Sequence, residues 1–258
     1  PVDFNGDDIY DCWQLTGTDG TKMIFGITDS TDTSKSAIRY TFSHDGSVGT
    51  VSSGIPSLYP YQWDLRAIIN TFGDTVKYWY QKENCSVVTN DFNSDSLNLL
   101  YTKASYPDSI VNSNGKSLKF VLEEKMSGSL LEPHDPYNYH SEPDGFMEIY
   151  ESKRLKRIHV YSPETDTPVK TIKLDYYFLN QHLGNRFLKS MLKSIEWRNN
   201  IAGTVENRYD FLYYDDSTQT EDTAGYNPNY HYGAIKRIRD YHGTITEYSY
   251  TQIEEADY

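Results

Sequence analysis

The chain has 258 residues, enough for one large all-β domain or for two small domains with cores of their own. Its formal net charge of −13 argues against nucleic acid as a partner, because nucleic-acid binding depends on Lys and Arg side chains that neutralise phosphates. No run of about 18 apolar residues occurs, so we expect no transmembrane segment.

The aromatic content of the sequence points to β-structure. The chain contains 24 Tyr, 10 Phe and 4 Trp, and aromatic side chains pack well on a pleated sheet. Cys12 and Cys85 lack a CxxC spacing, which leaves two free thiols and one disulfide as open alternatives. The first residues, PVDFNGDD, contain neither an initiator Met nor a secretory leader. We therefore expect a segment of a longer protein.

The first element in chain order is an acidic loop, DFNGDDIYD. It places carboxylate and amide oxygens at Asp3, Asn5, Asp7 and Asp11, which are positions one, three, five and nine of the loop. Calcium prefers such oxygen ligands around a sharp turn. Asp8 stands where calcium loops of this type usually have a second Gly. The loop is therefore either a calcium site, the one metal site that we predict, or a solvated acidic turn.

A unit of roughly 40 residues then recurs along the chain. Each copy has an apolar pair ending in Ile, a turn with Gly or Asn, and an aromatic-rich strand. The copies, some of them loose, are Leu65–Tyr80, Tyr106–Leu122, Arg154–Phe178, Leu192–Tyr214 and Gly233–Tyr250. Such a period with strand-turn-strand content is typical of propellers, β-solenoids and shells built from sheets. The alternative is an ordinary β-sandwich in which hairpins recur by chance.

Five stretches carry a resemblance to a known family. WQLTGTDGTKMIFG (Trp13–Gly26) is similar to a hairpin of the form W-x-L-T-x-x-D-G-T-x-x-x-F-G, and WDLRAIINTFGDTVKYWYQKE (Trp63–Glu83) to the element that follows it. The other stretches are YESKRLKRIHVY (Tyr150–Tyr161), FLKSMLKSIEW (Phe187–Trp197) and GAIKRIRDYHGTITEYSY (Gly233–Tyr250). In this order they resemble the Rhs/YD-repeat superfamily, particularly the B component of bacterial toxin complexes and the virulence-plasmid B proteins.

The resemblance implies an all-β fold of consecutive antiparallel hairpins, part of a large hollow β-shell that encloses a toxic polypeptide. It implies a structural, non-enzymatic segment of a secreted or cell-surface bacterial protein. Its partners would be the remainder of its own longer chain and the enclosed toxin. The sequence departs from the family at Tyr241-His242-Gly243, where Pro followed by Gly-Gly is usual. The aspartyl autocleavage motif that ends many Rhs shells is missing, so the resemblance implies an irregular segment that leads into such a shell.

Two other functions remain as alternatives. Exposed aromatics such as Trp63, Trp79 or Tyr139 could stack on sugar rings in an extracellular carbohydrate-binding module. A hydrolase of the glycosidase type would need two carboxyl groups that face one bond. The sequence offers three carboxylate doublets, Glu123-Glu124, Asp215-Asp216 and Glu254-Glu255. Neighbouring residues of a strand point to opposite faces, however, so we interpret the doublets as charged rims.

The remaining motifs favour no catalytic or cofactor-binding site. DFNSDSLNLLYT (Asp91–Thr102) begins like an EF-hand loop but lacks the Gly at position six and the Glu at position twelve. His134 and His140 lie in the Pro-rich stretch EPHDPYNYHSEPDG, which we interpret as an exposed loop rather than a zinc site. No GxSxG, P-loop or GxGxxG motif is present.

We expect a single domain over residues 1–258, with long loops at 127–145 and 216–229. The apolar spacing of four residues from Leu179 to Ile195 predicts at most a short helix around Asn185–Met191. The strand faces should supply the core. The residues that we expect to be buried are Leu65, Ile68, Tyr78, Leu155, Ile158, Leu192, Ile195, Ile235, Ile238 and Tyr248.

Overall fold

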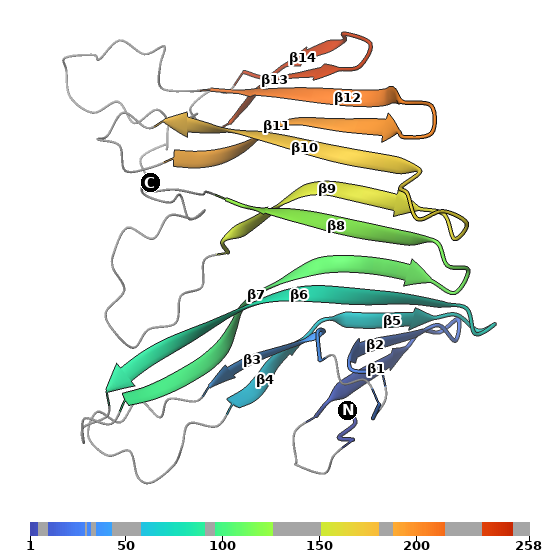
Figure 1. The fold of residues 1–258 in the computed structure, drawn as a ribbon, viewed down its shortest axis with the longest axis vertical. Helices are drawn as coiled ribbons and strands as arrows, with labels where there is room; N and C mark the ends of the chain where they lie inside the picture. Colours follow the sequence, from blue (N-terminus) through green and yellow to red (C-terminus); the bar gives the residue numbers. More distant parts are fainter. Residues whose placement is uncertain are drawn as a thin grey trace, which may run out of the picture. The chain divides into compact units, whose positions relative to one another are not determined.

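The computed structural model describes residues 1–4, 10–28, 30–31, 35–42, 58–90, 96–125, 151–180, 188–214 and 234–249. These residues form fourteen β-strands and no helix (Figure 1), which confirms the predicted all-β class. None of the described residues belongs to a helix that could span a membrane. The predicted loops 127–145 and 216–229 lie outside the described residues.

The strands are labelled in chain order. They are β1 (Cys12–Thr16), β2 (Lys22–Gly26), β3 (Ile38–Phe42), β4 (Leu58–Trp63), β5 (Leu65–Ile69), β6 (Thr75–Asn90), β7 (Ser96–Asn112), β8 (Ser117–Glu124), β9 (Lys153–Tyr161), β10 (Lys170–Asn180), β11 (Leu188–Asn199), β12 (Thr204–Tyr213), β13 (Ile235–Asp240) and β14 (Ile245–Glu247). Every pairing whose register is resolved is antiparallel.

The chain divides into two compact units. Among the described residues, unit 1 comprises Pro1–Phe120 with Val160–Thr167, and unit 2 comprises Ser152–His159 and Pro168–Tyr258 with the end of β8 from Val121. In unit 1 the hydrogen-bonded strand order is β1-β2-β5-β6-β7-β8, and β3 pairs with β4 in a second sheet. In unit 2 the order is β8-β9-β10-β11-β12-β13-β14. The expectation of a single domain stays a prediction.

The hairpin turns repeat one another in atomic detail. The amide of Gly73 donates to the carbonyl oxygen of Asn70, and Gly115 and Gly243 donate in the same way to Asn112 and Asp240. In each turn the side chain of that Asn or Asp also accepts from a backbone amide farther along the turn. Gly73 has a φ of 89°, a conformation that favours Gly over other residues. The Gly that the repeat places in each turn thus permits the backbone conformation, and the Asn or Asp before it accepts the hydrogen bonds that close the turn.

A second contact recurs between repeats. Tyr80 on β6 donates its hydroxyl proton to the carbonyl oxygen of Leu65, at 2.6 Å, and Tyr176 on β10 donates to Leu155 at the same distance. Each bond joins the aromatic strand of one predicted copy to the first residue of its Leu-x-x-Ile pair. Burial raises the pKa of Tyr80 to about 12, so this hydroxyl stays protonated over the physiological range.

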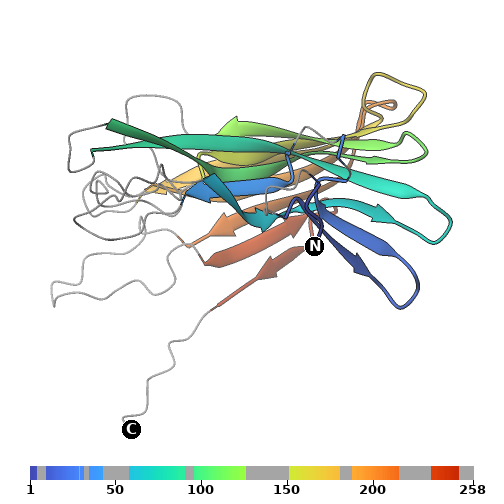
Figure 2. The same ribbon diagram turned by 90° about the horizontal axis from the view of Figure 1, so that it is seen from below.

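Unit 1 has an apolar core with a second layer on it. The sheet β3–β4 lies beside the long strands β6 and β7 (Figures 1 and 2), and the amide of Tyr40 donates to the hydroxyl oxygen of Thr102 on β7. Ile38 on β3 is almost fully buried. The other deeply buried apolar residues of the unit include Cys12, Ile24, Ile27, Ala37, Ala67, Tyr101, Ala104 and Tyr106.

Two backbone segments of unit 1 pack closely against each other at its N-terminal hairpin. Gly26 has a φ of 90°, and a Cβ there would clash with the carbonyl oxygen of Asp11. The amide of Ile27 donates to that same oxygen. Cys12 and Cys85 form no disulfide, which answers the question that their spacing left open. Burial raises the pKa of the Cys12 thiol.

Unit 2 has a single sheet whose described residues are mostly half-buried. Met191 is its one deeply buried apolar side chain among the described residues, whereas Thr171, Ser194 and Glu196 are deeply buried polar ones. Apolar residues alternate with these polar residues along β10 and β11, so the polar side chains share one face of the sheet.

Two expectations about individual residues are wrong. Tyr248 is exposed, and the other nine residues predicted to be buried are half-buried, because the burial of a strand residue depends on what covers its face of the sheet and not on the local pattern alone. Leu188–Met191 belongs to β11 rather than to a helix, since this segment pairs with Tyr177–Asn180 of β10. Residues 185–187 lie outside the described residues.

Candidate functional site

The predicted calcium loop is described only at its two ends. Asp11 is buried, and its Oδ2 accepts a hydrogen bond of 2.9 Å from the amide of Phe4. Asn5 and Asp7 lie outside the described residues. No group of three acidic, His or Cys side chains that could hold a metal occurs within the described ranges. The calcium site of Asp3, Asn5, Asp7 and Asp11 therefore stays a prediction.

Two of the aromatics considered for sugar stacking, Trp63 and Trp79, have protein partners. Trp63 is half-buried, donates through Nε1 to the carbonyl oxygen of Tyr10, and meets the ring of Trp13 edge to face. Trp79 is half-buried as well, and the guanidinium of Arg66 lies 4.7 Å from the centre of its ring. Tyr139 lies outside the described residues. The two described Trp rings thus serve the packing of unit 1.

The described carboxylate doublet, Glu123-Glu124, pairs with cations instead of facing another carboxylate. Glu123 accepts from Arg154 at 2.8 Å and from Lys156 at 2.9 Å. Burial alone would raise the pKa of Glu123, but these two hydrogen-bonded cations outweigh it, so the pKa is lowered. A carboxyl group held as an anion in this way is no proton donor for hydrolysis. Asp215-Asp216 and Glu254-Glu255 lie outside the described residues.

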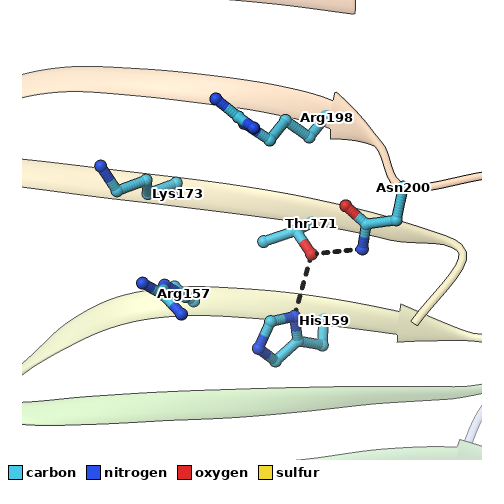
Figure 3. Close-up of a pocket in the computed structure, with 6 residues that line it drawn as sticks. All are labelled: Arg157, His159, Thr171, Lys173, Arg198 and Asn200. Atoms are coloured by element: carbon cyan, nitrogen blue, oxygen red, sulfur yellow. Dashed lines mark hydrogen bonds between the residues drawn. The ribbon is translucent and has the colours of Figure 1, made fainter. Parts of the chain in front are cut away.

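A pocket lies on the polar face of unit 2 (Figure 3). It has a volume of about 360 Å³ and is lined by Arg157, His159, Thr171, Lys173, Arg198 and Asn200. These residues come in pairs from β9, from β10, and from the end of β11 with the turn after it. Each strand pair is two residues apart, and Thr171 lies opposite Arg198 in the register, so strand alternation brings them to one face.

Hydrogen bonds fix one end of the pocket. Asn200 donates through Nδ2 to the hydroxyl oxygen of Thr171 at 2.7 Å and to the carbonyl oxygen of Pro168 at 3.0 Å. The same hydroxyl lies 2.9 Å from Nδ1 of His159, to which it can donate its own proton. Burial lowers the pKa of His159, and the neighbouring charge of Arg157 lowers it further. A neutral imidazole with Nδ1 as acceptor fits this arrangement.

The other end of the pocket is cationic. Arg157, Lys173 and Arg198 extend in one direction along the sheet, away from the Thr171 end (Figure 3). Lys173 pairs with Asp175 at 3.0 Å, and Arg198 donates through Nε to Glu196 at 2.7 Å. Arg157 has neither a hydrogen bond nor an ion pair with any described residue. No carboxylate of the described residues lines the pocket.

The rest of the polar face is a ladder of ion pairs. Glu196 accepts from Arg198 and, at 3.3 Å, from Arg208 on β12. Asp210 accepts from Arg208 at 2.8 Å and from Arg239 on β13 at 3.0 Å. The hydrogen bonds from these two arginines outweigh burial and lower the pKa of Asp210. Charged side chains from β11, β12 and β13 thus form ion pairs with one another across the sheet.

Sequence reasoning missed this pocket. Its cations lie far apart in the chain, and a net charge of −13 suggests no cationic surface. The alternation of charged and apolar residues in RLKRIHVY and TIKLDYYF was the available signal. That alternation predicts on which side of its strand each residue lies. Only the order of β9, β10 and β11 in the sheet brings these residues together.

Comparison with solved structures finds toxin proteins of the kinds that the sequence resemblance named. A crystal structure of TcdB2-TccC3-Cdc42 has 14% identity and a TM-score of 0.45, over 82% of this chain and 11% of that chain. A Tc holotoxin pore of Photorhabdus luminescens has 14% identity and a TM-score of 0.43, over 81% and 10%. The N-terminal domain of the effector SpvB from Salmonella typhimurium has 15% identity and a TM-score of 0.41, over 75% and 62%.

The chain thus spans about a tenth of the length of the toxin-complex chains that it matches. No family model matches the chain, and neither does any curated protein sequence.

Proposed function

We propose that the chain is a non-catalytic wall segment of a secreted, toxin-associated bacterial β-shell that encloses a polypeptide cargo. Its partners would be the remainder of its own longer chain and the enclosed toxin polypeptide. The resemblance of five motifs, in order, to the Rhs/YD-repeat superfamily motivates this proposal.

The observation that carries the proposal is the nearest-neighbour order of the strands. In each unit, every strand of the main sheet pairs with the next main-sheet strand along the chain, with β3–β4 as the one insertion among the described elements. Repeat architectures in which each unit contacts only its neighbours have this order. The recurring turn at Asn70, Asn112 and Asp240 indicates that the hairpins are variants of one unit.

The half-buried sheet faces favour a wall over a self-sufficient domain. Leu155, Ile158, Leu192 and Ile195 keep part of their surface accessible in unit 2. Leaving large apolar side chains partly in water forgoes stabilisation of about 25 cal/mol per Å². A wall segment recovers that free energy when further shell or cargo surface covers the sheet.

The described polar residues favour a structural role over hydrolysis. Glu123, Asp210 and Glu196 each accept hydrogen bonds from two cationic side chains. In a retaining or inverting glycosidase one of two facing carboxyl groups must keep a proton. Carboxylates held between two cations are poor candidates for that proton donor.

Protease protection of the cargo tests this function. The full-length protein, with the sequences that flank Pro1 and Tyr258, should shield its enclosed polypeptide from added protease. Deleting residues 1–258 should make the cargo cleavable, while a deletion of equal length outside the shell should leave it protected. Equal protection after both deletions would refute the wall role.

An activity and binding screen separates the two alternatives. The isolated chain should show no turnover on polysaccharides or esters and no specific binding on a glycan array. Turnover lost on a single Asp or Glu substitution would favour the hydrolase. Glycan binding lost with Trp79→Ala would favour the carbohydrate-binding module.

A further inference from the structure

We propose that the pocket of Arg157, Lys173 and Arg198 binds a tetrahedral oxyanion, namely a phosphate or sulfate group. This inference concerns the polar face of unit 2 and does not depend on the wall role of the chain. The anion would lie against the three cationic side chains, beyond the end that Thr171 and Asn200 close.

In a neighbouring pocket of unit 2 the protein itself supplies the anion, the carboxylate of Asp210. There Arg208 and Arg239, from adjacent strands, both donate to Asp210, at 2.8 and 3.0 Å. This second pocket is lined by Arg208, Asp210, Arg239, Asp240, Tyr241 and Gly243. Two cations on neighbouring strands thus hold a carboxylate between them.

The Arg157 pocket has the cations without such a carboxylate. Both carboxylate oxygens of Asp175 lie 3.0 Å from Nζ of Lys173, and Glu196 accepts from Nε of Arg198 at 2.7 Å, but neither carboxylate lines the cavity. Among the described residues no anion interacts with Arg157. An external anion would therefore accept hydrogen bonds from these cations, as Asp210 does in the neighbouring pocket.

The donors that remain suit several oxygen atoms. Arg198 uses Nε for Glu196, and its two terminal nitrogens have no hydrogen-bond partner among the described residues. Arg157 has its whole guanidinium available within the described part of the chain. Two such forks and the ammonium of Lys173 offer more donors than the two oxygens of a carboxylate accept. Phosphate and sulfate present three or four oxygens and two charges.

The side chains of the pocket are already positioned in the protein without an anion. Strands β9, β10 and β11 fix the spacing of the three side chains, and the hydrogen bonds of Thr171 fix the closed end. Arg157 makes no hydrogen bond or ion pair with a described residue, so an anion that binds it displaces no existing ion pair there.

Titration with inorganic phosphate, sulfate and acetate at constant ionic strength tests the site. Phosphate and sulfate should raise the melting temperature of the chain, because a ligand that binds the native state stabilises it. Acetate should raise it much less. Arg157→Gln should weaken phosphate binding by about 10-fold or more, since it removes charge-assisted hydrogen bonds. Lys173→Gln and Arg198→Gln should also weaken it.

Two substitutions serve as matched controls. Arg237→Gln removes a cation of β13 that pairs with Glu247, and Lys170→Gln removes an exposed cation of β10 that pairs with Glu206. Both should leave phosphate affinity within about 2-fold. Circular dichroism verifies that each variant folds, and Lys173→Gln decides the question if Arg157→Gln does not fold.

Phenyl phosphate distinguishes the two sources of the anion. Binding of phenyl phosphate as tight as that of inorganic phosphate would support the site and indicate a phosphate ester on a larger molecule. Binding of the inorganic ions alone would support the site for a free anion. The proposal is overturned if phosphate acts no more strongly than chloride or acetate, or if the control variants lose as much affinity as Arg157→Gln.

Discussion

The two units solve the same problem, a sheet of consecutive hairpins, in different ways. Unit 1 places a second sheet, β3–β4, beside its long strands and buries Ile38, Ala67 and Ala104 almost completely. Unit 2 has no such layer among its described residues, and its most deeply buried side chains are Ser194, Met191, Thr171 and Glu196. Unit 1 thus combines a covered apolar core with a few buried charged side chains such as Asp64 and Arg66, whereas the deeply buried side chains of unit 2 are mostly polar.

The two units therefore differ in the kind of interaction that stabilises them. Apolar burial stabilises without needing directional partners, so unit 1 is equipped to hold its own structure. Buried charges stabilise little by themselves, and breaking a pair is costly. The polar face of unit 2 should therefore add less net stability than the apolar core of unit 1, although breaking one of its ion pairs is costly.

The largest expected effect is the loss of core volume in unit 1. Ile38→Ala should lower the free energy of unfolding by about 2–5 kcal/mol, because Ile38 is 1% exposed and a cavity remains. The matched change in unit 2, Ile158→Ala, should cost about 1 kcal/mol, since the side chain is half-buried. Urea unfolding measures both. Equal losses at the two sites would erase the contrast between the units.

The next effect concerns the buried charge of unit 2. Glu196→Gln should lower the free energy of unfolding by about 1–3 kcal/mol, because Arg198 and Arg208 lose a charged acceptor. Glu206→Gln is the control on β12, where the loss of an exposed pair with Lys170 should lower stability much less. A smaller loss at Glu196 than at Glu206 would mean that the ladder does not stabilise unit 2.

Between pH 8 and 10 the pH dependence of stability should come from Lys82 in unit 1. Burial lowers the pKa of Lys82 to about 8, against an opposing effect of Asp64 and with a smaller contribution from Lys35. The folded state therefore loses this proton more easily than the unfolded state, whose Lys titrates near 10.4. Stability should rise between pH 8 and about 10 as the native ammonium deprotonates.

Substitution at Lys82 provides the check on this pH range. Lys82→Met should flatten the rise in melting temperature between pH 8 and 10, whereas Lys119→Met, at an exposed pair with Asp108, should retain it. Above pH 10 the trend reverses, since the raised pKa of Tyr80, about 12, means that the unfolded state loses its proton first. A wild-type profile that falls from pH 8 onward would contradict the assignment.

The smallest effect is the predicted calcium stabilisation near the N-terminus of unit 1. Calcium at about ten times its dissociation constant should stabilise the chain by about 1.4 kcal/mol, which a chelator reverses. Asp7→Ala should abolish the shift in melting temperature, and Asp166→Ala, at an exposed turn, should keep it. Identical melting curves of the wild type with calcium and with chelator would remove the site.

The sequence predicts the local structure well because local rules cause it. Gly73, Gly115 and Gly243, which the repeat places in turns, do lie in turns, and a strand precedes and follows each of them. The spacing that suggested a helix near Leu188 fails because pairing with β10 outweighs a weak periodic preference. The burial of Ile158 or Tyr248 depends on what covers a sheet face, and no local pattern reports that.

The pocket is harder to predict for the same reason. Arg157, Lys173 and Arg198 each obey a local alternation of polar and apolar residues, yet their meeting depends on the order of β9, β10 and β11. The net charge of the whole chain is equally uninformative, because it averages a cationic pocket with acidic segments elsewhere.

Electron cryomicroscopy of the full-length protein, with the sequences that flank this chain, tests the wall role most directly. If the chain is a wall segment, β1 and β14 should pair with strands of flanking sequence, and polypeptide density should lie against one face of the sheet. A map in which β14 ends the sheet and both faces of unit 2 contact solvent would contradict the wall role.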